Sequence, residues 1–347
     1  MPLADHTPRG HAARYIGACY IGMRDDSART EAYRAAIAAA AIGKIAIDIG
    51  TGAQALLAVM AADAGAKHVY AIEVQPAAAA AARLAVEAAG HAGRITILEG
   101  FSTDAAVLLP EKAELLLHEL VGEVAGEEGG VRAILDATRR HMDPAAPRPF
   151  SIPARATTMI APCEYPDEAY CARVPSAMLR CAGSARALKL PELLPRDRLL
   201  ASPQRCEDMR FEAGAPLASQ STDLIFVATR AGLLAGLVMH VELHCGVGAA
   251  DAPPDVSSAW RGSHWRNVLL TLDAILPVLA GQRVRVLTRA ELGAQTPVYQ
   301  FEAWVEDLEG RDASKGDVLR WRSLGPAMSY PGSSLNCNDM MDHLMAA

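Results

Sequence analysis

The sequence predicts an α/β chain in two parts, a doubly wound parallel sheet followed by an antiparallel β-barrel with a helical arm. Strand-like and helix-like segments alternate up to about residue 142. A proline-rich stretch, DPAAPRPFSIP (143–153), then ends the alternation. Beyond it, short apolar runs recur at fairly regular spacing with weak helical periodicity. Alternating strands and helices indicate a parallel sheet wrapped by helices, whereas closely spaced strands indicate a barrel or a sandwich.

The first part can be divided into elements from local signals. Helices are predicted over residues 27–43, 54–65, 76–90 and 130–142, and strands over residues 44–50, 67–74, 94–100 and 113–120. Glycine ends each of the first three helices, and Pro76 begins the third, which is the asymmetry that helix termini favour. Right-handed crossovers between such strands give a doubly wound arrangement.

The second part contains eight strand-like runs. They cover residues 154–162, 206–211, 222–230, 236–245, 267–274, 282–290, 298–307 and 318–324. Residues 165–205 are less regular, and we expect them to form the helical arm. The predicted division is therefore residues 1–43 as N-terminal helices, 44–150 as the parallel-sheet domain and 151–347 as the barrel.

Composition limits the class of protein. The chain has 347 residues, of which 51% are hydrophobic, and a formal net charge of −7, so it can form two domains and lacks the basic balance of nucleic-acid-binding proteins. Its seven cysteines include no CxxC pair, which argues against a zinc site or a disulfide framework. No secretion signal or membrane-length apolar run is visible. We therefore expect a cytoplasmic protein with no metal and no nucleic-acid or membrane partner.

A glycine-containing turn after the first strand indicates a cofactor site. The run AIDIGTG (46–52) ends a strand and opens a helix, and Gly50 and Gly52 let the backbone approach a ligand closely. Glu73, at the end of the next strand, is placed to bind a ribose diol. Dinucleotides and S-adenosylmethionine (SAM) both use this Rossmann-like layout. The third glycine of GxGxxG is missing, and Asp48 suits an ammonium group better than a pyrophosphate, so SAM is favoured.

A second signal is the segment HELVGEVAGEEGG (118–130), which places four glutamates in one glycine-rich loop after an apolar strand. Taken alone, this segment is compatible both with an exposed acidic loop and with a binding site.

Several stretches together resemble the protein arginine methyltransferase family. MRDDSARTEAYRAAI (23–37) resembles its N-terminal signature helix, IDIGTG followed by AADAGAKHVYAIEV its SAM motifs, and PEKAELLLHELVGE with the following Glu128 its double-glutamate loop. IPARATTMIAP (152–162) resembles the segment entering the family's barrel, and SSAWRGSHWRNVLLTLD (257–273) its Thr-His-Trp loop, with Ser263 for threonine. The resemblance implies SAM as cofactor, S-adenosylhomocysteine as product and arginine N-methylation.

The resemblance implies that two of the four glutamates hold the substrate. A guanidinium is planar, charged and donates five hydrogen bonds in a fixed fork, so two carboxylates can clamp it and direct one nitrogen toward the methyl group. The family's pair stands nine residues apart, a spacing that Glu119 and Glu128 keep. Glu127 is the alternative second clamp residue, and Glu123 is expected to be solvated or to brace the loop.

Further roles follow from the same resemblance. His264 is expected near the clamp, where it either bonds a glutamate or helps to take the departing proton, and Trp265 is expected to pack beneath the loop. Arg29 is expected to pair with the SAM carboxylate and Met23 to touch the substrate nitrogen. The weaker candidates are Ser102, Thr103 and Asp104 near adenine and Tyr20 near the cofactor.

Departures from the family leave the substrate open. The aromatic N-terminal motif is not visible, His118 replaces a serine, and Leu120 replaces a tryptophan. We expect free L-arginine or a small guanidine metabolite of a biosynthetic pathway slightly in preference to arginine in proteins. The alternatives are methylation of another amine or of an oxygen, and a SAM-binding module without catalysis. A homodimer formed through the arm is also expected.

Overall fold

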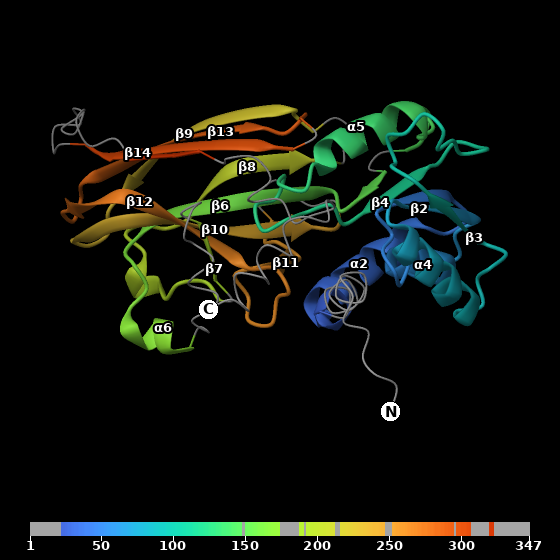
Figure 1. Ribbon diagram of the computed structural model, residues 1–347, viewed down its shortest axis with the longest axis horizontal. Coiled ribbons are helices and arrows are strands. Elements are labelled where there is room, and N and C mark those ends of the chain that lie inside the picture. The colour runs from blue at the N-terminus through green and yellow to red at the C-terminus, as the bar shows by residue number, and fades with distance from the viewer. Residues whose placement is uncertain are drawn as a thin grey trace.

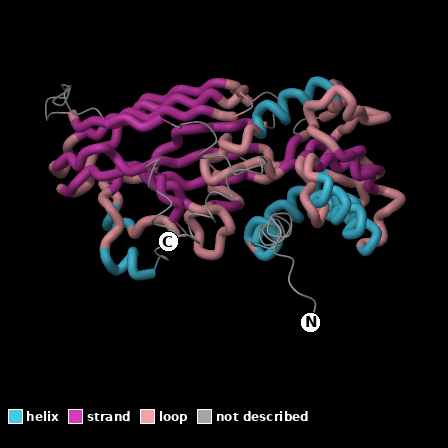
Figure 2. The backbone as a smooth tube through the Cα atoms, viewed as in Figure 1, coloured by secondary structure: helices cyan, strands magenta, loops and turns pink. Residues whose placement is uncertain are grey.

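The computed structural model describes residues 22–147, 150–173, 187–190, 192–211, 216–246, 252–294, 296–306 and 319–322. Tyr20 and much of the expected arm lie outside these ranges. The described chain forms a parallel-sheet part and an antiparallel part that lie side by side (Figure 1). Strands dominate one end of the molecule and most helices lie at the other (Figure 2). One continuous apolar core runs through both parts.

The parallel sheet confirms the predicted doubly wound fold. Its order is β3 (Ile95–Glu99), β2 (His68–Glu73), β1 (Ile45–Ile49), β4 (Leu115–His118) and β5 (Ser151–Ile152). Every pairing is parallel. The chain moves outward from β1 to β3 and then returns to place β4 on the other side of β1. Ligands of such sheets bind at the carboxyl ends of the strands where the order reverses, which here means beyond β1 and β4.

The four helices predicted for the first part are present, with shorter ends. They are α2 (Ser27–Ala40), α3 (Leu56–Asp63), α4 (Pro76–Ala88) and α5 (Gly130–Arg140). The helix α3 begins two residues later than expected because Ala55 adopts a left-handed conformation, with φ of 45°. The strand β5 falls within the stretch interpreted as a boundary. It is two residues long and prolines stand at 149 and 153, so it gave no strand signal.

The antiparallel part consists of two sheets, and each of the eight predicted runs coincides with a strand. The first sheet has the order β7 (Ala187–Leu190), β12 (Asn267–Val278), β10 (Gly232–His244), β6 (Arg155–Cys163) and β8 (Gln204–Arg210), with β11 (Val256–Ser257) beside β10. The second has the order β15 (Leu319–Arg322), β14 (Val298–Val305), β13 (Arg283–Glu291) and β9 (Ser219–Val227). Contacts of β8 with β9 and of β12 with β15 join the sheets along two sides, as in a barrel.

The described portions of the predicted arm lie along the first antiparallel sheet, where β7 pairs with β12 as an edge strand. They include α6 (Glu168–Arg173), β7 and the 3-10 helix η1 (Arg196–Arg198). Tyr170, Leu194 and Leu199 form a small second core with apolar residues of β6, β10 and β12. Within the described residues, no helix has the length and apolar character needed to cross a bilayer.

Candidate functional site

A pocket of about 400 Å³, part of it open to solvent, lies at the carboxyl ends of β1 and β4. Met23 and Arg29 line it from the start of α2 and the residues before it, Asp48 and Gly50 from the end of β1, and Glu119 from the segment after β4. These five predicted residues, separate in sequence, therefore meet at one place. Thr51 and Gln54, which the motif analysis did not single out, also line the pocket.

Asp48 is the most deeply buried acidic group of the pocket. Its Oδ2 accepts a hydrogen bond of 2.6 Å from the Thr51 hydroxyl, while its Oδ1 is buried and has no hydrogen-bond partner in the described structure. Burial is the main cause that raises the pKa of Asp48 to about 7. A buried carboxylate oxygen without a partner is costly, and an ammonium group in the pocket would relieve that cost. Asp48 Oδ2 thus braces the turn, and Asp48 Oδ1 could accept a hydrogen bond from a ligand.

The glycine turn after β1 is held by the end of β2. Gly50 and Gly52 have φ values of 74° and 68°, in the left-handed region that glycine tolerates best. The Gly52 amide donates to Glu73 Oε2 at 2.9 Å, and the Gln75 amide donates to Glu73 Oε1 at 2.8 Å. Each carboxylate oxygen keeps a second lone pair, so Glu73 can brace the turn and still accept bonds from a diol.

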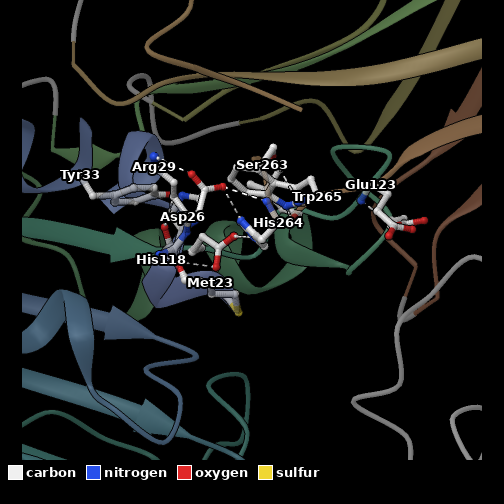
Figure 3. Close-up of polar contacts among 12 residues, drawn as sticks. Met23, Asp26, Arg29, Tyr33, His118, Glu123, Ser263, His264 and Trp265 are labelled. Carbon is white, nitrogen blue, oxygen red and sulfur yellow. Dashed lines mark hydrogen bonds and ion pairs between the residues drawn. The ribbon is translucent and has the colours of Figure 1, made fainter. Parts of the chain in front are cut away.

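Glu119 belongs to a row of four charged side chains of alternating sign, Arg29, Glu119, His264 and Asp26. Its Oε2 accepts a 2.8 Å bond from the Arg29 guanidinium, and its Oε1 lies 3.7 Å from His264 Nε2. The other imidazole nitrogen, His264 Nδ1, lies 2.9 Å from Asp26 Oδ2, which also accepts a bond from the His264 amide. Figure 3 shows Asp26, beside Arg29, facing His264 on the loop that carries Ser263 and Trp265. Arg29, predicted to meet the SAM carboxylate, thus pairs here with a predicted clamp residue.

The alternation of charges in this row favours the charged form of each side chain. Burial opposes ionisation of Glu119, but Arg29 and His264 hold the pKa of Glu119 below its ordinary value. Burial likewise opposes the charge on His264, yet Asp26 and Glu119 raise the pKa of His264. Hydrogen bonds from His264 and Arg29 outweigh burial and lower the pKa of Asp26. Opposite charges at these distances favour the charged form of each of these groups.

Asp26 was missed by the sequence analysis. It is the N-cap of α2, where its side chain accepts a bond from the Arg29 amide. An aspartate at this position is a common helix cap, and that local role gave no hint of the contact with His264, 238 residues away in sequence.

The four glutamates of the loop at 119–129, hereafter the glutamate loop, have different surroundings. Glu127 is buried, and its Oε1 accepts a 2.7 Å bond from the Glu123 amide. Glu123 is also buried and forms an ion pair with Lys189 of β7, so it braces the loop and is not solvated. Glu128 is exposed. The loop therefore uses Glu123 and Glu127 in internal contacts, whereas Glu119 lines the pocket and Glu128 is exposed.

Glu128 has an exposed side chain, and its pKa is nevertheless shifted by its surroundings. Burial first, and then the negative charges of Glu119 and Glu123, raise the pKa of Glu128 to about 8. His264 and Lys189 act in the opposite direction. A cation bound between Glu119 and Glu128 would remove their repulsion, which is the electrostatic behaviour expected of a clamp.

Two further side chains support the glutamate loop from below. Trp265 is buried, as predicted, and its indole nitrogen donates to the Val121 carbonyl at 2.8 Å. His118 is fully buried, contacts Phe211 edge-on and has a pKa lowered by burial to about 3, so it is neutral. Its carbonyl oxygen accepts a bond from the Tyr33 hydroxyl at 3.2 Å, which fixes the start of the glutamate loop against α2.

The weaker candidates lie apart from the lining of this pocket. Ser102, Thr103 and Asp104 follow β3, and none of them lines the pocket. The Ser102 carbonyl accepts a bond from Arg140, and Asp104 Oδ1 accepts one from the Ala106 amide at 2.9 Å. Their proposed contact with adenine stays a prediction. Within the described part of the chain, no group of three or more histidine, cysteine or acidic residues is arranged to hold a metal ion.

Curated proteins with similar sequences are arginine methyltransferases. The chain is 31% identical over 160 residues to a probable protein arginine N-methyltransferase 6 of Arabidopsis thaliana, a match covering 45% of this chain and 35% of that protein. It is 36% identical over 125 residues to a probable histone-arginine methyltransferase 1.3 of the same plant, covering 35% of this chain and 23% of that protein. The chain thus spans well under half the length of these relatives. No protein-family model matches it.

Solved structures with the same fold are also arginine methyltransferases. Arabidopsis thaliana protein arginine methyltransferase 10, in an open conformation, matches with a TM-score of 0.66 and 17% identity over 88% of this chain and 96% of that one. The Trypanosoma brucei PRMT1 enzyme–prozyme heterotetrameric complex with AdoHcy matches with a TM-score of 0.64 and 20% identity over 87% and 97%. These likenesses establish the fold, a Rossmann-like sheet followed by antiparallel sheets.

Proposed function

We propose that this chain, whose fold and sequence relatives are those of the protein arginine N-methyltransferases, transfers a methyl group from SAM to a guanidino nitrogen of arginine. The observation that supports the proposal most is that Glu119 lines the pocket, while Glu128 on the same loop is exposed and feels the charge of Glu119, and the other two glutamates of the loop are buried in contacts within the protein.

The residues around the pocket fit SAM. The unpartnered Oδ1 of Asp48 suits the ammonium of its methionine moiety, and Glu73 suits its ribose diol. The left-handed turn at Gly50 and Gly52 lets the ligand approach the backbone. SAM supplies the chemistry of a methyl group bound to a positively charged sulfur.

The clamp residues would hold and polarise the guanidinium. Glu119 and Glu128 would accept charge-assisted hydrogen bonds from its N–H groups, fix its plane and draw its positive charge away from the reacting nitrogen. His264, itself held by Asp26, keeps Glu119 ionised and oriented. Once a bound cation offsets the negative charge of Glu119, which contributes to the raised pKa of Glu128, Glu128 can be ionised and accept the proton that the nitrogen releases.

The comparisons favour arginine in proteins as the substrate. The relatives with matching sequence are named as protein and histone arginine methyltransferases, which supports that branch over the free-arginine branch favoured by sequence alone. The departures at His118 and Leu120 do not argue against this choice, because His118 is a buried neutral spacer and the Leu120 side chain packs at the Gly50 turn. A homodimer through the arm, and a cytoplasmic location, remain part of the proposal.

Methyl transfer from labelled SAM tests the proposal directly. We expect label in arginine-rich peptides, identified by mass spectrometry as methylarginine, and little in free L-arginine offered at the same concentration. Label in free arginine alone would support free L-arginine or a small guanidine metabolite as the substrate instead. Label in neither, with SAM binding intact by calorimetry, would identify a binding module without turnover, and label on another amine would identify a different chemistry.

A further inference from the structure

The buried carboxylate of Glu207 on β8 contacts the glutamate loop from the antiparallel part. Its Oε2 accepts bonds from the Gly126 amide at 3.3 Å and from the Thr158 hydroxyl of β6. Its Oε1 accepts a 2.9 Å bond from the Tyr299 hydroxyl of β14. Thr158 Oγ1 in turn accepts a 2.9 Å bond from the Ala125 amide. Two consecutive amides of the loop are therefore held by one buried network.

The loop backbone lies directly on this network. A Cβ atom added to Gly126 would come within 2.6 Å of Glu207 Oε1 and 2.8 Å of the Tyr299 hydroxyl oxygen. The backbone at Gly126 does not have a positive φ, so the need for glycine here comes from close contact. Only one residue separates Gly126 from Glu128, so a shift at Gly126 passes directly to the clamp carboxyl.

We propose that Glu207 is a positioning residue that sets the location of Glu128 by holding the Gly126 and Ala125 amides, directly and through Thr158. This inference rests on the proposed function, in which Glu128 holds the substrate. Removing the carboxylate leaves the Gly126 amide and two hydroxyls without their acceptor in a buried place, and a loop that moves to find other partners displaces Glu128. A displacement of about 1 Å at a positioning group can cost on the order of 10²-fold in rate.

Two adjacent threonines offer a matched pair of variants. Both are fully buried on β6, but Thr158 Oγ1 links the loop to Glu207, whereas Thr157 Oγ1 has no partner among the described residues. Thr158→Val and Thr157→Val therefore make the same chemical change with and without loss of the anchor. Glu207→Ala removes the carboxylate, and Glu207→Gln restores an acceptor of the same shape without the charge.

The experiment combines hydrogen–deuterium exchange of the glutamate loop, kcat and KM for an arginine peptide, and calorimetric affinity for S-adenosylhomocysteine. We expect Thr158→Val and Glu207→Ala to speed exchange at residues 121–129 and to lower kcat/KM by on the order of 10²-fold, with cofactor affinity unchanged. Thr157→Val should match the wild type, and Glu207→Gln should recover part of the loss.

The inference is overturned if Thr158→Val leaves both loop exchange and kcat/KM as in the wild type. It is also overturned if cofactor affinity falls in parallel with activity, because that result means general loss of structure. A wild-type protein that methylates no arginine substrate would refute the proposed function instead, and the exchange measurement would still decide whether Glu207 anchors the loop.

Discussion

Glu127 and Glu128 are neighbours in sequence, but Glu127 is buried whereas Glu128 is exposed. Burial raises the pKa of Glu127 well above its ordinary value, and its Oε1 accepts a bond from the Glu123 amide. Glu127→Gln keeps an acceptor of the same shape at this place and should change kcat/KM little. Glu128→Gln should lower kcat/KM for an arginine peptide by about 10²- to 10³-fold, as for loss of one preorganised electrostatic contact.

Steady-state kinetics of the two single variants, with unfolding temperatures as the control for folding, decides between them. If Glu127→Gln lowers kcat/KM more than Glu128→Gln does, the second clamp residue is Glu127, which is the alternative that the sequence analysis also allowed.

The pair of Asp26 and His264 predicts a pH-dependent stability. Because the folded-state pKa of His264 is raised, the pair contributes fully below the ordinary histidine pKa of about 6.5, and this contribution is lost as pH rises through the raised value. The lowered pKa of Asp26 means that its own charge is lost only below about pH 4. Asp26→Asn should therefore cost about 1–3 kcal/mol of unfolding free energy at pH 6, and less at pH 9.

Urea denaturation across this pH range measures the difference. Asp25→Asn is the matched control, because Asp25 is exposed and forms its ion pair with Arg24. An Asp26→Asn effect that is equal at both pH values would mean that the backbone hydrogen bonds of Asp26, and not the charge of His264, account for its contribution.

At the scale of elements, the turn from β1 to α3 predicts a cofactor-specific effect of a glycine substitution. Gly50 has a φ of 74°, and a Cβ there would lie 3.1 Å from Leu120 Cδ2 in the pocket region. Gly43 has a similar φ of 71° but open space around it, beyond the end of α2. Both alanine variants should lose about 1–2 kcal/mol of stability from backbone strain. Gly50→Ala alone should weaken S-adenosylhomocysteine binding, by more than about 10-fold.

Calorimetric titration of both variants provides the comparison. Equal affinities in Gly50→Ala and Gly43→Ala would show that the turn does not approach the cofactor, and would count against the assignment of this pocket to SAM.

The elements that sequence predicted well are those with a continuous local signal. The buried strand β1 reads as an apolar run, and α4 begins at Pro76 and is followed by Gly90, so both were located within a few residues. The strand β5 could not be predicted, because its two residues have no periodicity and owe their conformation to pairing with β4. Asp26, Lys189 and Glu207 were missed for a related reason. Their partners lie far away in sequence, and each residue alone is an ordinary helix cap or strand residue.

At the scale of the whole molecule, Trp265 connects the antiparallel part to the glutamate loop. Trp265→Phe removes the bond from its indole nitrogen to the buried Val121 carbonyl and should cost about 1–3 kcal/mol of stability. It should also raise KM for an arginine peptide. Trp260→Phe is the control, because Trp260 is on the same loop and is 45% exposed. Thermal unfolding and kinetics that fail to distinguish the two variants would show that Trp265 does not support the loop.

The glutamate loop belongs to the parallel-sheet part but is held by the antiparallel part, and this affects how the protein can evolve. Glu119 and Glu128 belong to the parallel-sheet part, but Glu207, Thr158, Trp265 and Lys189, all in the antiparallel part, hold the loop that carries them. Exchanging the antiparallel part for that of a distant relative would therefore remove the supports of the clamp along with any surface that selects substrates. New specificities are expected to arise by change outside this set of contacts, with the loop and its supports inherited as one unit.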